Sequence, residues 1–232
     1  MTDSVKIAYK NKNVVVIVKP CGMPSQSDPS GDKDAMTATS ELLSGAGEDG
    51  KLWLVHRLDR TVGGLIAFAR SKKSAAELSR IVANGELEKK YIAVCHGSVR
   101  QGEYRDYLFK DSATGKAYVV KTERKGAKEA VLIADLLAEE EDVSLVSVSL
   151  ITGRFHQIRA QLSAAGTPLV GDKKYGSRDL RANHPALFSR YLSFSLFGKK
   201  IKVSALPDIE EYPWNTFGKE IYKSLDKENE ND

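Results

Sequence analysis

Two short segments of the sequence concentrate side chains that can do acid–base, nucleophilic or ion-pair chemistry. Residues 56–60 read HRLDR, so the carboxylate of Asp59 lies between two arginines, and Gly63 and Gly64 follow. Residues 153–159 read GRFHQIR and add two guanidinium groups, an imidazole and an amide. A carboxylate beside a guanidinium stays ionised, and it can act as a nucleophile or as a base. Core packing explains neither segment, so both are candidates for a functional site.

Sites of several familiar classes are missing from the sequence. Gly166 and Gly171 have four residues between them, as in a phosphate-binding loop, but Asp172 stands where that loop requires lysine. No G-x-S-x-G or H-E-x-x-H pattern occurs, and the four histidines and two cysteines lack metal-ligand spacing. We therefore expect chemistry that uses neither a metal ion nor a cofactor.

Strand patterns dominate the elements that must position these two segments. Strands are predicted over residues 5–9, 14–18, 52–55, 64–69, 91–94, 104–109, 117–120, 130–137, 143–150, 192–196 and 200–203. A helix is predicted over residues 35–43 with Asp34 as its N-cap. A second helix follows Ser71 and ends near Gly85. Strands that follow strands, with few helices between them, favour a largely antiparallel sheet of the α+β class.

The GRFHQIR segment is predicted to form a third helix. Thr152 would cap this helix, and Gly166 would end it. Phe155 and Ile158 would then lie on its apolar side, and Arg159 would project near the same face. The HRLDR segment lies between two predicted strands, so we expect a loop there.

Composition and length place the chain among ordinary globular proteins. It has 232 residues and a formal net charge of +4, which is compatible with nucleic-acid binding without demanding it. We expect one domain over residues 1–222 and a disordered acidic tail over residues 223–232. The longest apolar run near the N-terminus, residues 14–18, is far shorter than the roughly 20 residues that span a bilayer. Because no signal-peptide pattern occurs either, we expect a cytoplasmic protein with no membrane contact, and a monomer since no exposed apolar stripe is evident.

The order and spacing of five segments resemble the RluA-type pseudouridine synthases. The three signature segments of that family are similar to HRLDR at 56–60, KKYIA at 89–93 and TGRFHQIR at 152–159. Residues 14–20 with Gly22 resemble the family's opening strand and K-P-x-G turn, and residues 168–176 resemble the segment after its third motif. The family usually has Thr-Ser-Gly after HRLDR, whereas this chain has TVGG at 61–64. The resemblance extends from about residue 5 to about residue 206.

This resemblance implies a fold, a reaction and a substrate class. The fold would be the pseudouridine synthase fold, a mostly antiparallel mixed sheet in two half-domains with a central cleft. The reaction would isomerise uridine to pseudouridine in structured ribosomal or transfer RNA. It breaks the bond between uracil N1 and the ribose and rejoins the base through carbon 5, which requires no electrons and no external energy. An aspartate would act without a cofactor.

The resemblance also implies roles for individual residues. Asp59 would be the catalytic aspartate, Tyr91 the aromatic side chain against the target uracil, and Arg159 the partner of the Asp59 carboxylate. Arg57 would enter the space that the flipped nucleotide leaves, where a planar cation can replace lost stacking. Whether Asp59 attacks the ribose or the base stays open. Contacts to RNA are also expected from a group of polar side chains, for which structural capping is an equal alternative: His56, Arg60, Arg154, His156 and Gln157.

Two other functions remain alternatives. The chain could be a catalytically inactive RNA-binding protein of the same fold that assists ribosome assembly, although the joint presence of Asp59, Tyr91 and Arg159 favours an enzyme. It could also be a hydrolase, but this would require a second carboxylate near Asp59, and the sequence shows no obvious one. The lysine-rich residues 110–128 would either follow an RNA backbone or form a solvated edge.

Overall fold

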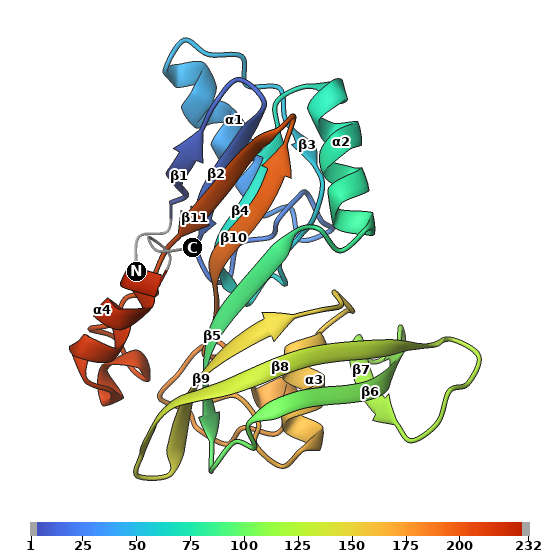
Figure 1. Ribbon diagram of the computed structural model, residues 1–232, viewed down its shortest axis with the longest axis vertical. Coiled ribbons are helices and arrows are strands. Elements are labelled where there is room, and N and C mark those ends of the chain that lie inside the picture. The colour runs from blue at the N-terminus through green and yellow to red at the C-terminus, as the bar shows by residue number, and fades with distance from the viewer. Residues whose placement is uncertain (1–3, 229–232) are drawn as a thin grey trace. The chain divides into compact units, whose positions relative to one another are not determined.

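The computed structural model describes residues 4–228, and this range holds eleven strands and four α-helices (Figure 1). The chain forms two compact units, each assembled from separate stretches of sequence. Within the described range, unit 1 comprises the residues up to Lys89, then Phe188–Pro207 and Glu228. Unit 2 comprises Lys90–Leu187 and Asp208–Lys227. The predicted α+β class and the two half-domains are thus confirmed.

Unit 1 is built on a mixed sheet. Its strands are β1 (Lys6–Lys10), β2 (Val14–Lys19), β3 (Trp53–Leu54), β4 (Gly63–Ala69), β10 (Leu187–Leu196) and β11 (Lys199–Ser204). The order is β1-β2-β4-β10, with β3 paired to β4 and β11 paired to β10. Adjacent strands run antiparallel except for β4 and β10, which are parallel where Gly63 and Gly64 lie beside Phe188 and Ser189. The sheet therefore agrees with the mostly antiparallel arrangement expected from the sequence.

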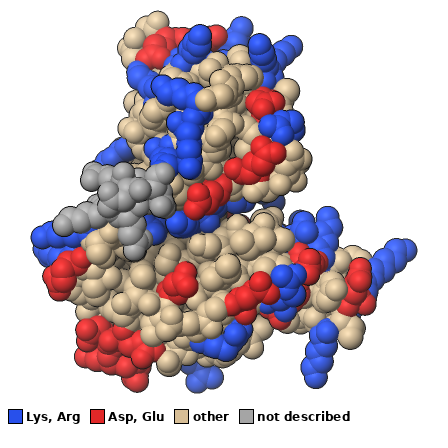
Figure 2. All heavy atoms as spheres, in the orientation of Figure 1, with Lys and Arg blue, Asp and Glu red and all other residues tan. Residues whose placement is uncertain are grey.

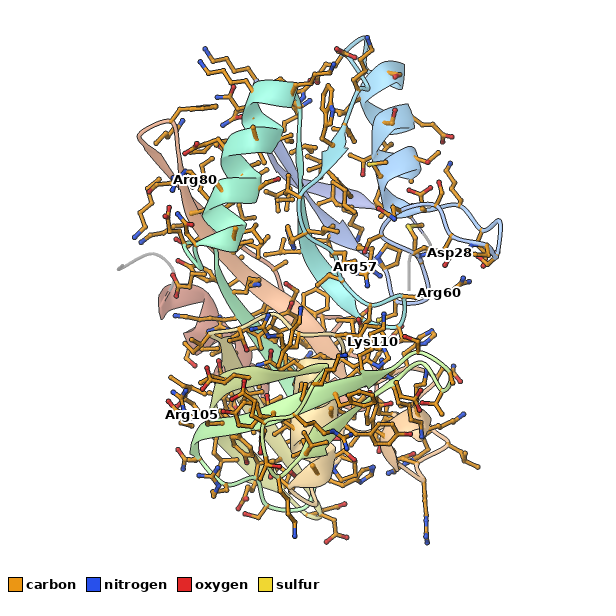
Figure 3. All side chains as sticks on the ribbon, turned by 90° about the vertical axis from the view of Figure 1, so that its right-hand side faces the viewer. Asp28, Arg57, Arg60, Arg80, Arg105 and Lys110 are labelled. Atoms are coloured by element: carbon orange, nitrogen blue, oxygen red, sulfur yellow. The ribbon has the colours of Figure 1, made fainter. Side chains whose placement is uncertain are left out.

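Two helices cover the unit 1 sheet on opposite sides (Figure 3). They are α1 (Ala35–Gly45) and α2 (Lys72–Ala83). The predicted caps are both present, because Asp34 accepts a hydrogen bond from the Thr37 N–H and Ser71 accepts one from the Ser74 N–H. One face of the sheet packs against the apolar side of α2 in a buried cluster that includes Val14, Val16, Leu65, Ala67, Leu78 and Ile81.

Unit 2 is an antiparallel sheet with helix α3 (Gln157–Ala164) packed against it. Its strands are β5 (Glu88–His96), β6 (Gly102–Asp111), β7 (Lys116–Val120), β8 (Ala127–Glu140) and β9 (Val143–Leu150), in the order β5-β9-β8-β6-β7. Helix α3 packs on β6, β7 and β8 through a cluster formed by Leu108, Ala117, Ala130, Ala160 and Tyr175. A short 3₁₀ turn, η1 (Lys173–Tyr175), carries the tyrosine of this cluster.

The predicted start of the third helix was wrong. Helix α3 begins at Gln157, and His156 before it has left-handed backbone angles of φ 53° and ψ 27°. Thr152 does not cap the helix, since its hydroxyl accepts from the Val131 N–H and donates to the Gln157 side chain. Phe155 therefore lies in a loop ahead of the helix and not on its apolar face.

The C-terminal tail also differs from the prediction of disorder. A short 3₁₀ turn, η2 (Trp214–Thr216), leads into helix α4 (Lys219–Glu228), which includes the first six residues of the expected tail. Tyr222 and Leu225 are buried on α4, and the Tyr222 hydroxyl donates to the Trp214 carbonyl at 2.7 Å. An acidic composition concealed this apolar face. Residues 229–232 lie outside the described part of the chain.

Candidate functional site

The loop that carries Asp59 is held in unit 1 by hydrogen bonds to its backbone on both sides of the carboxylate. Buried Ser25 donates its hydroxyl to the Leu58 carbonyl at 2.8 Å and accepts the Leu58 N–H at 3.1 Å. On the other side, the Arg60 carbonyl accepts the Gly22 N–H at 2.9 Å. Asp59 itself is half-buried, and its carbonyl accepts from the Val62 N–H at 3.0 Å. The carboxylate is thus presented from a rigid turn.

Lys19 lies beneath this turn and is fully buried. Its ammonium donates to the carbonyl oxygens of Pro20 at 2.9 Å, Met23 at 2.8 Å and Arg60 at 3.3 Å. Burial lowers the pKa of Lys19 from 10.5 to about 8, while the nearby charges of Cys21 and Asp59 raise it. The lysine therefore fastens the K-P-x-G turn to the Asp59 loop and adds positive charge beneath it.

The two arginines that flank Asp59 have different surroundings. Arg60 is bound within unit 1, because its guanidinium pairs with Asp32 and Asp28 and contacts the Ser30 hydroxyl at 2.9 Å (Figure 3). These side chains belong to the loop before α1, so Arg60 ties that loop to the Asp59 turn. Arg57, by contrast, is exposed.

His56 is hydrogen-bonded to the backbone of β4. Its Nε2 accepts the Ala67 N–H of β4 at 3.0 Å, which extends the pairing of β4 beyond β3. Burial, followed by the charge of Lys89, lowers the pKa of His56 to about 3. The imidazole is therefore neutral, and the nitrogen that could accept from RNA is already used by the backbone.

A glycine is required immediately after the Asp59 loop. Gly64 has a φ of +111°, and a Cβ there would lie 2.4 Å from the Ser189 carbonyl oxygen. This close approach is where β4 and β10 run parallel. The second glycine of the TVGG sequence thus has a packing reason.

In unit 2, Tyr91 lies on β5, opposite Val148 of β9, and is 7% exposed. The segment after α3 runs along the other edge of β5, where the Val170 N–H donates to the Val94 carbonyl and the His96 N–H to the Pro168 carbonyl, both at 2.9 Å. The chain then turns at Gly171, whose φ is +76° and where a Cβ would lie 2.3 Å from the His184 carbonyl oxygen.

This turn delivers Asp172 to Arg159. The Arg159 Nε donates to Asp172 Oδ2 at 2.7 Å and its Nη2 to Oδ1 at 2.9 Å. Both side chains are buried, with 5% and 1% of their surface exposed. The guanidinium also lies 5.0 Å from the centre of the Tyr175 ring. A paired, bidentate contact of this kind fixes the plane of the arginine.

Next to this ion pair, the rings of Tyr175, His156 and Phe155 contact one another in sequence. The Tyr175 hydroxyl accepts the Ala117 N–H at 2.7 Å and contacts His156 Nδ1 at 2.9 Å. The His156 ring stacks on Phe155 with 3.8 Å between ring centres. Burial, then the charges of Arg159 and Lys174, lower the pKa of His156 to about 3, so the imidazole is neutral.

Gln157 holds the loop that carries these rings. Its Oε1 accepts the Arg154 N–H at 2.9 Å and the Thr152 hydroxyl at 2.8 Å, and its Nε2 donates to the Val131 carbonyl at 3.1 Å. Arg154 is exposed, with its Nε donating to the Glu129 carbonyl at 2.8 Å. The amide therefore has a positioning role, whereas Arg154 is accessible to a ligand.

Sequence reasoning missed three of the residues that hold the site: Lys19, Ser25 and Asp172. A signal existed for Lys19 and Asp172, because both lie in segments that resemble the family, at the K-P-x-G turn and after the third motif. Nothing in the sequence marked Ser25.

Residues 4–228 include no helix that is both long and apolar enough to cross a membrane. The same range shows no cluster of three or more His, Cys, Asp or Glu side chains that could hold a metal ion.

Comparison with known families decides what this arrangement belongs to. The sequence model of the family described as RNA pseudouridylate synthase matches residues 13–164, which include both charged segments. The chain is an RluA-type RNA pseudouridine synthase. It isomerises uridine to pseudouridine in RNA, as the resemblance implied.

Individual proteins similar to this chain support its assignment to the pseudouridine synthase family. An uncharacterized RNA pseudouridine synthase of Mycoplasma genitalium is 30% identical over 238 residues, covering 94% of this chain and 71% of the relative. Ribosomal large subunit pseudouridine synthase C of Rickettsia bellii is 30% identical over 207 residues, covering 86% of this chain and 67% of the relative. The solved structure of human RNA pseudouridylate synthase domain containing 4 has a TM-score of 0.74 at 23% identity and covers 90% of each chain, which shows the shared fold.

Proposed function

We propose that this pseudouridine synthase acts on structured ribosomal RNA, with transfer RNA as the alternative, and that it uses Asp59 and no cofactor. The Rickettsia bellii relative is named as a ribosomal large subunit enzyme, which favours ribosomal RNA. The face drawn in Figure 2 carries basic and acidic side chains in separate small groups over a largely uncharged surface. Since no broad positive field covers that face, we expect recognition to depend on RNA shape as well as on charge.

The observation that carries the role of Asp59 is the immobilised turn beneath it. Ser25, Gly22 and Lys19 bind the backbone on both sides of the carboxylate, and Arg60 ties the preceding loop to the same turn. A catalytic group held in place before the substrate arrives avoids an entropic cost in the transition state. An aspartate that only contacts solvent does not need its backbone to be restrained in this way.

The reaction assigns distinct tasks to the chain. The bond from uracil N1 to the ribose breaks, the base turns, and carbon 5 bonds to the ribose while its proton is lost and N1 gains one. Asp59 supplies the carboxylate at the ribose or the base, and Tyr91 supplies a ring against the uracil. Exposed Arg57 fills the stack that the uridine leaves. That Arg159 is the cation for Asp59 stays a prediction, beside its observed pairing with Asp172.

The experiment that tests this function compares wild type with Asp59→Asn on total RNA from a strain that lacks the gene. New pseudouridines are mapped at single positions by a chemical method. We expect wild type to restore one or a few sites and Asp59→Asn to restore none. Asp49→Asn is a matched control, because Asp49 is an exposed unit 1 carboxylate whose Oδ1 accepts a local Lys51 N–H at 2.9 Å.

Each alternative function predicts a different result in the same assay. If both proteins bind RNA and neither changes a uridine, the chain is an RNA-binding protein of this fold. If uracil is released and no pseudouridine forms, the chain is a hydrolase. If Asp59→Asn restores the same sites as wild type, the role of Asp59 is refuted while the isomerase activity stands.

A further inference from the structure

Phe155 lies in an unusual place for a large apolar side chain. Its side chain packs against the cluster between α3 and the unit 2 sheet, yet the residue stays half-buried in a loop. The Lys110 ammonium lies 4.8 Å from the ring centre, and the His156 ring stacks against Phe155. An aromatic ring that combines a stacked neighbour with an overlying cation has the features of a nucleobase platform.

The loop around Phe155 is built at an energetic cost. His156 adopts a left-handed backbone with φ 53°, which is strained for a residue with a Cβ. The Tyr175 hydroxyl holds the His156 ring, and Gln157 holds the turn from Thr152 onwards. The two rings are therefore fixed before any ligand arrives, and a fixed platform loses little entropy on binding.

Cations surround this platform. Lys110 and Leu108 lie two residues apart on β6, and Lys128 is directly opposite Leu108 on β8, so all three side chains share the face that packs on α3. Arg154 precedes Phe155, and Lys174 is among the charges that act on His156. Lys110, Lys128, Arg154 and Lys174 are all exposed.

The acids near the platform do not cancel these charges. The charged groups that lower the pKa of His156 include Arg159, Lys174 and Lys110, and the Asp172 carboxylate, which raises it, is paired with Arg159. Glu129 follows Lys128, but its carboxylate pairs with Arg105. The platform is thus aromatic at its centre and positive around it, which suits a nucleotide with its base stacked and its phosphates bound.

We propose that Phe155, with the surrounding basic residues, binds a second nucleotide of the RNA, apart from the uridine that is isomerised. An unpaired base stacks on the Phe155 ring in place of the Lys110 ammonium, which moves to an adjacent phosphate. Lys128, Arg154 and Lys174 bind the flanking backbone. This assignment rests on the proposed function, because it takes the ligand to be the RNA that the enzyme modifies, and it makes Phe155 a determinant of which unpaired loops are accepted.

The test measures RNA affinity and needs no turnover. All variants carry Asp59→Asn, and the probes are a fluorescein-labelled RNA hairpin with an all-uridine loop and the same hairpin whose loop nucleotides lack bases. Phe155→Leu keeps an apolar side chain on the cluster and removes the ring. We expect it to raise the Kd for the uridine loop by about 5- to 150-fold, the range that base stacking on an aromatic side chain gives. For the abasic loop we expect no change beyond about 2-fold, because stacking then contributes nothing.

A matched control is Phe109, which precedes Lys110 on strand β6. Phe109 has the Arg124 guanidinium 4.6 Å from its ring centre and occupies the opposite face of β6. Phe109→Leu should leave both Kd values unchanged, and Phe155→Tyr should restore tight binding. Thermal unfolding of each variant checks that the fold is intact.

Three results would overturn the subsite: an equal effect of Phe155→Leu on both hairpins, no effect on either, or an equal effect of Phe109→Leu. Failure of the wild-type chain to bind the uridine hairpin would overturn it too. These results are distinct from failure of the proposed function, which is read from pseudouridine formation by protein without the Asp59→Asn change.

Discussion

Breaking the buried ion pair between Arg159 and Asp172 should destabilise unit 2 strongly, and removing both charges together should not. Asp172→Asn keeps the shape of the side chain but removes the carboxylate that pairs with the buried Arg159 guanidinium. Arg159→Met leaves an uncompensated carboxylate in the same place. In the double variant, Arg159→Met with Asp172→Leu, neither buried charge remains, and apolar side chains replace both.

The size of the effect follows from the burial and geometry of the pair. The side chains are 5% and 1% exposed, and the two hydrogen bonds measure 2.7 and 2.9 Å. Removing one partner of such a pair costs about 3–5 kcal/mol, whereas replacing both by apolar groups is often neutral or stabilising. For a protein of this size, a loss of about 3–5 kcal/mol lowers the Tm by roughly 6–20 °C.

The assay is urea unfolding followed by the fluorescence of Trp214, which lies in unit 2. Trp53→Phe in every variant removes the signal of unit 1. We expect each single variant to lose about 3–5 kcal/mol and the double variant to recover at least 2 kcal/mol of that loss. A loss under about 1 kcal/mol in Asp172→Asn, or a double variant less stable than either single one, would refute the reasoning.

The same double variant separates folding from catalysis. If it folds as well as wild type yet forms no pseudouridine, the positive charge of Arg159 is needed for the reaction itself. If it folds and retains activity, Arg159 only stabilises unit 2, and its predicted role beside Asp59 is wrong.

Three further predictions concern unit 1. Ser25→Ala removes both hydrogen bonds to Leu58 and should cost about 1–3 kcal/mol of stability. It should also make the Asp59 turn mobile and so lower the single-turnover rate of pseudouridine formation about 10-fold. An unchanged rate would show that the turn needs no such restraint. Gly64→Ala should abolish soluble expression because its Cβ would meet a carbonyl at 2.4 Å, whereas Gly85→Ala, with φ +73° but open space, should cost only about 1–2 kcal/mol in thermal unfolding. Because the pKa of His56 is near 3 when folded and about 6.5 when unfolded, the unfolded chain takes up the proton first as pH falls. Between pH 6.5 and 5, wild type should therefore lose up to about 2 kcal/mol more than His56→Gln in urea unfolding, and equal losses would contradict the assignment.

The strands and the first two helices were predictable because their signals are local. Alternating β-branched residues specify a strand, and Asp34 and Ser71 cap helices through bonds to residues three positions on. The family segments supplied the reaction and the candidate Asp59, Tyr91 and Arg159. These features depend on short stretches of sequence whose pattern can be recognised without knowing the tertiary contacts.

The remaining features depend on contacts between distant residues. Thr152 has the side chain of an N-cap, but Val131, twenty-one residues earlier, uses its hydroxyl and shifts the start of the helix. Asp172 reaches Arg159 because the intervening chain is hydrogen-bonded to β5 and turns at Gly171. The helix α4 exists because Tyr222 finds a buried partner at Trp214. No spacing rule could have given these contacts.

The division of the sequence between the two units has a consequence for how the gene can be cut. Residues 90–187 of unit 2 interrupt unit 1, which resumes as β10 and β11, and the chain then returns to unit 2 at Asp208. That returning stretch contributes Tyr212, whose hydroxyl is bound to Asp179, and the buried face of α4. A stop codon after Pro207 would therefore damage unit 2 although it falls at the end of a unit 1 stretch, after strand β11. Each unit is encoded by separated pieces of the gene, so no single truncation point removes one unit and leaves the other complete.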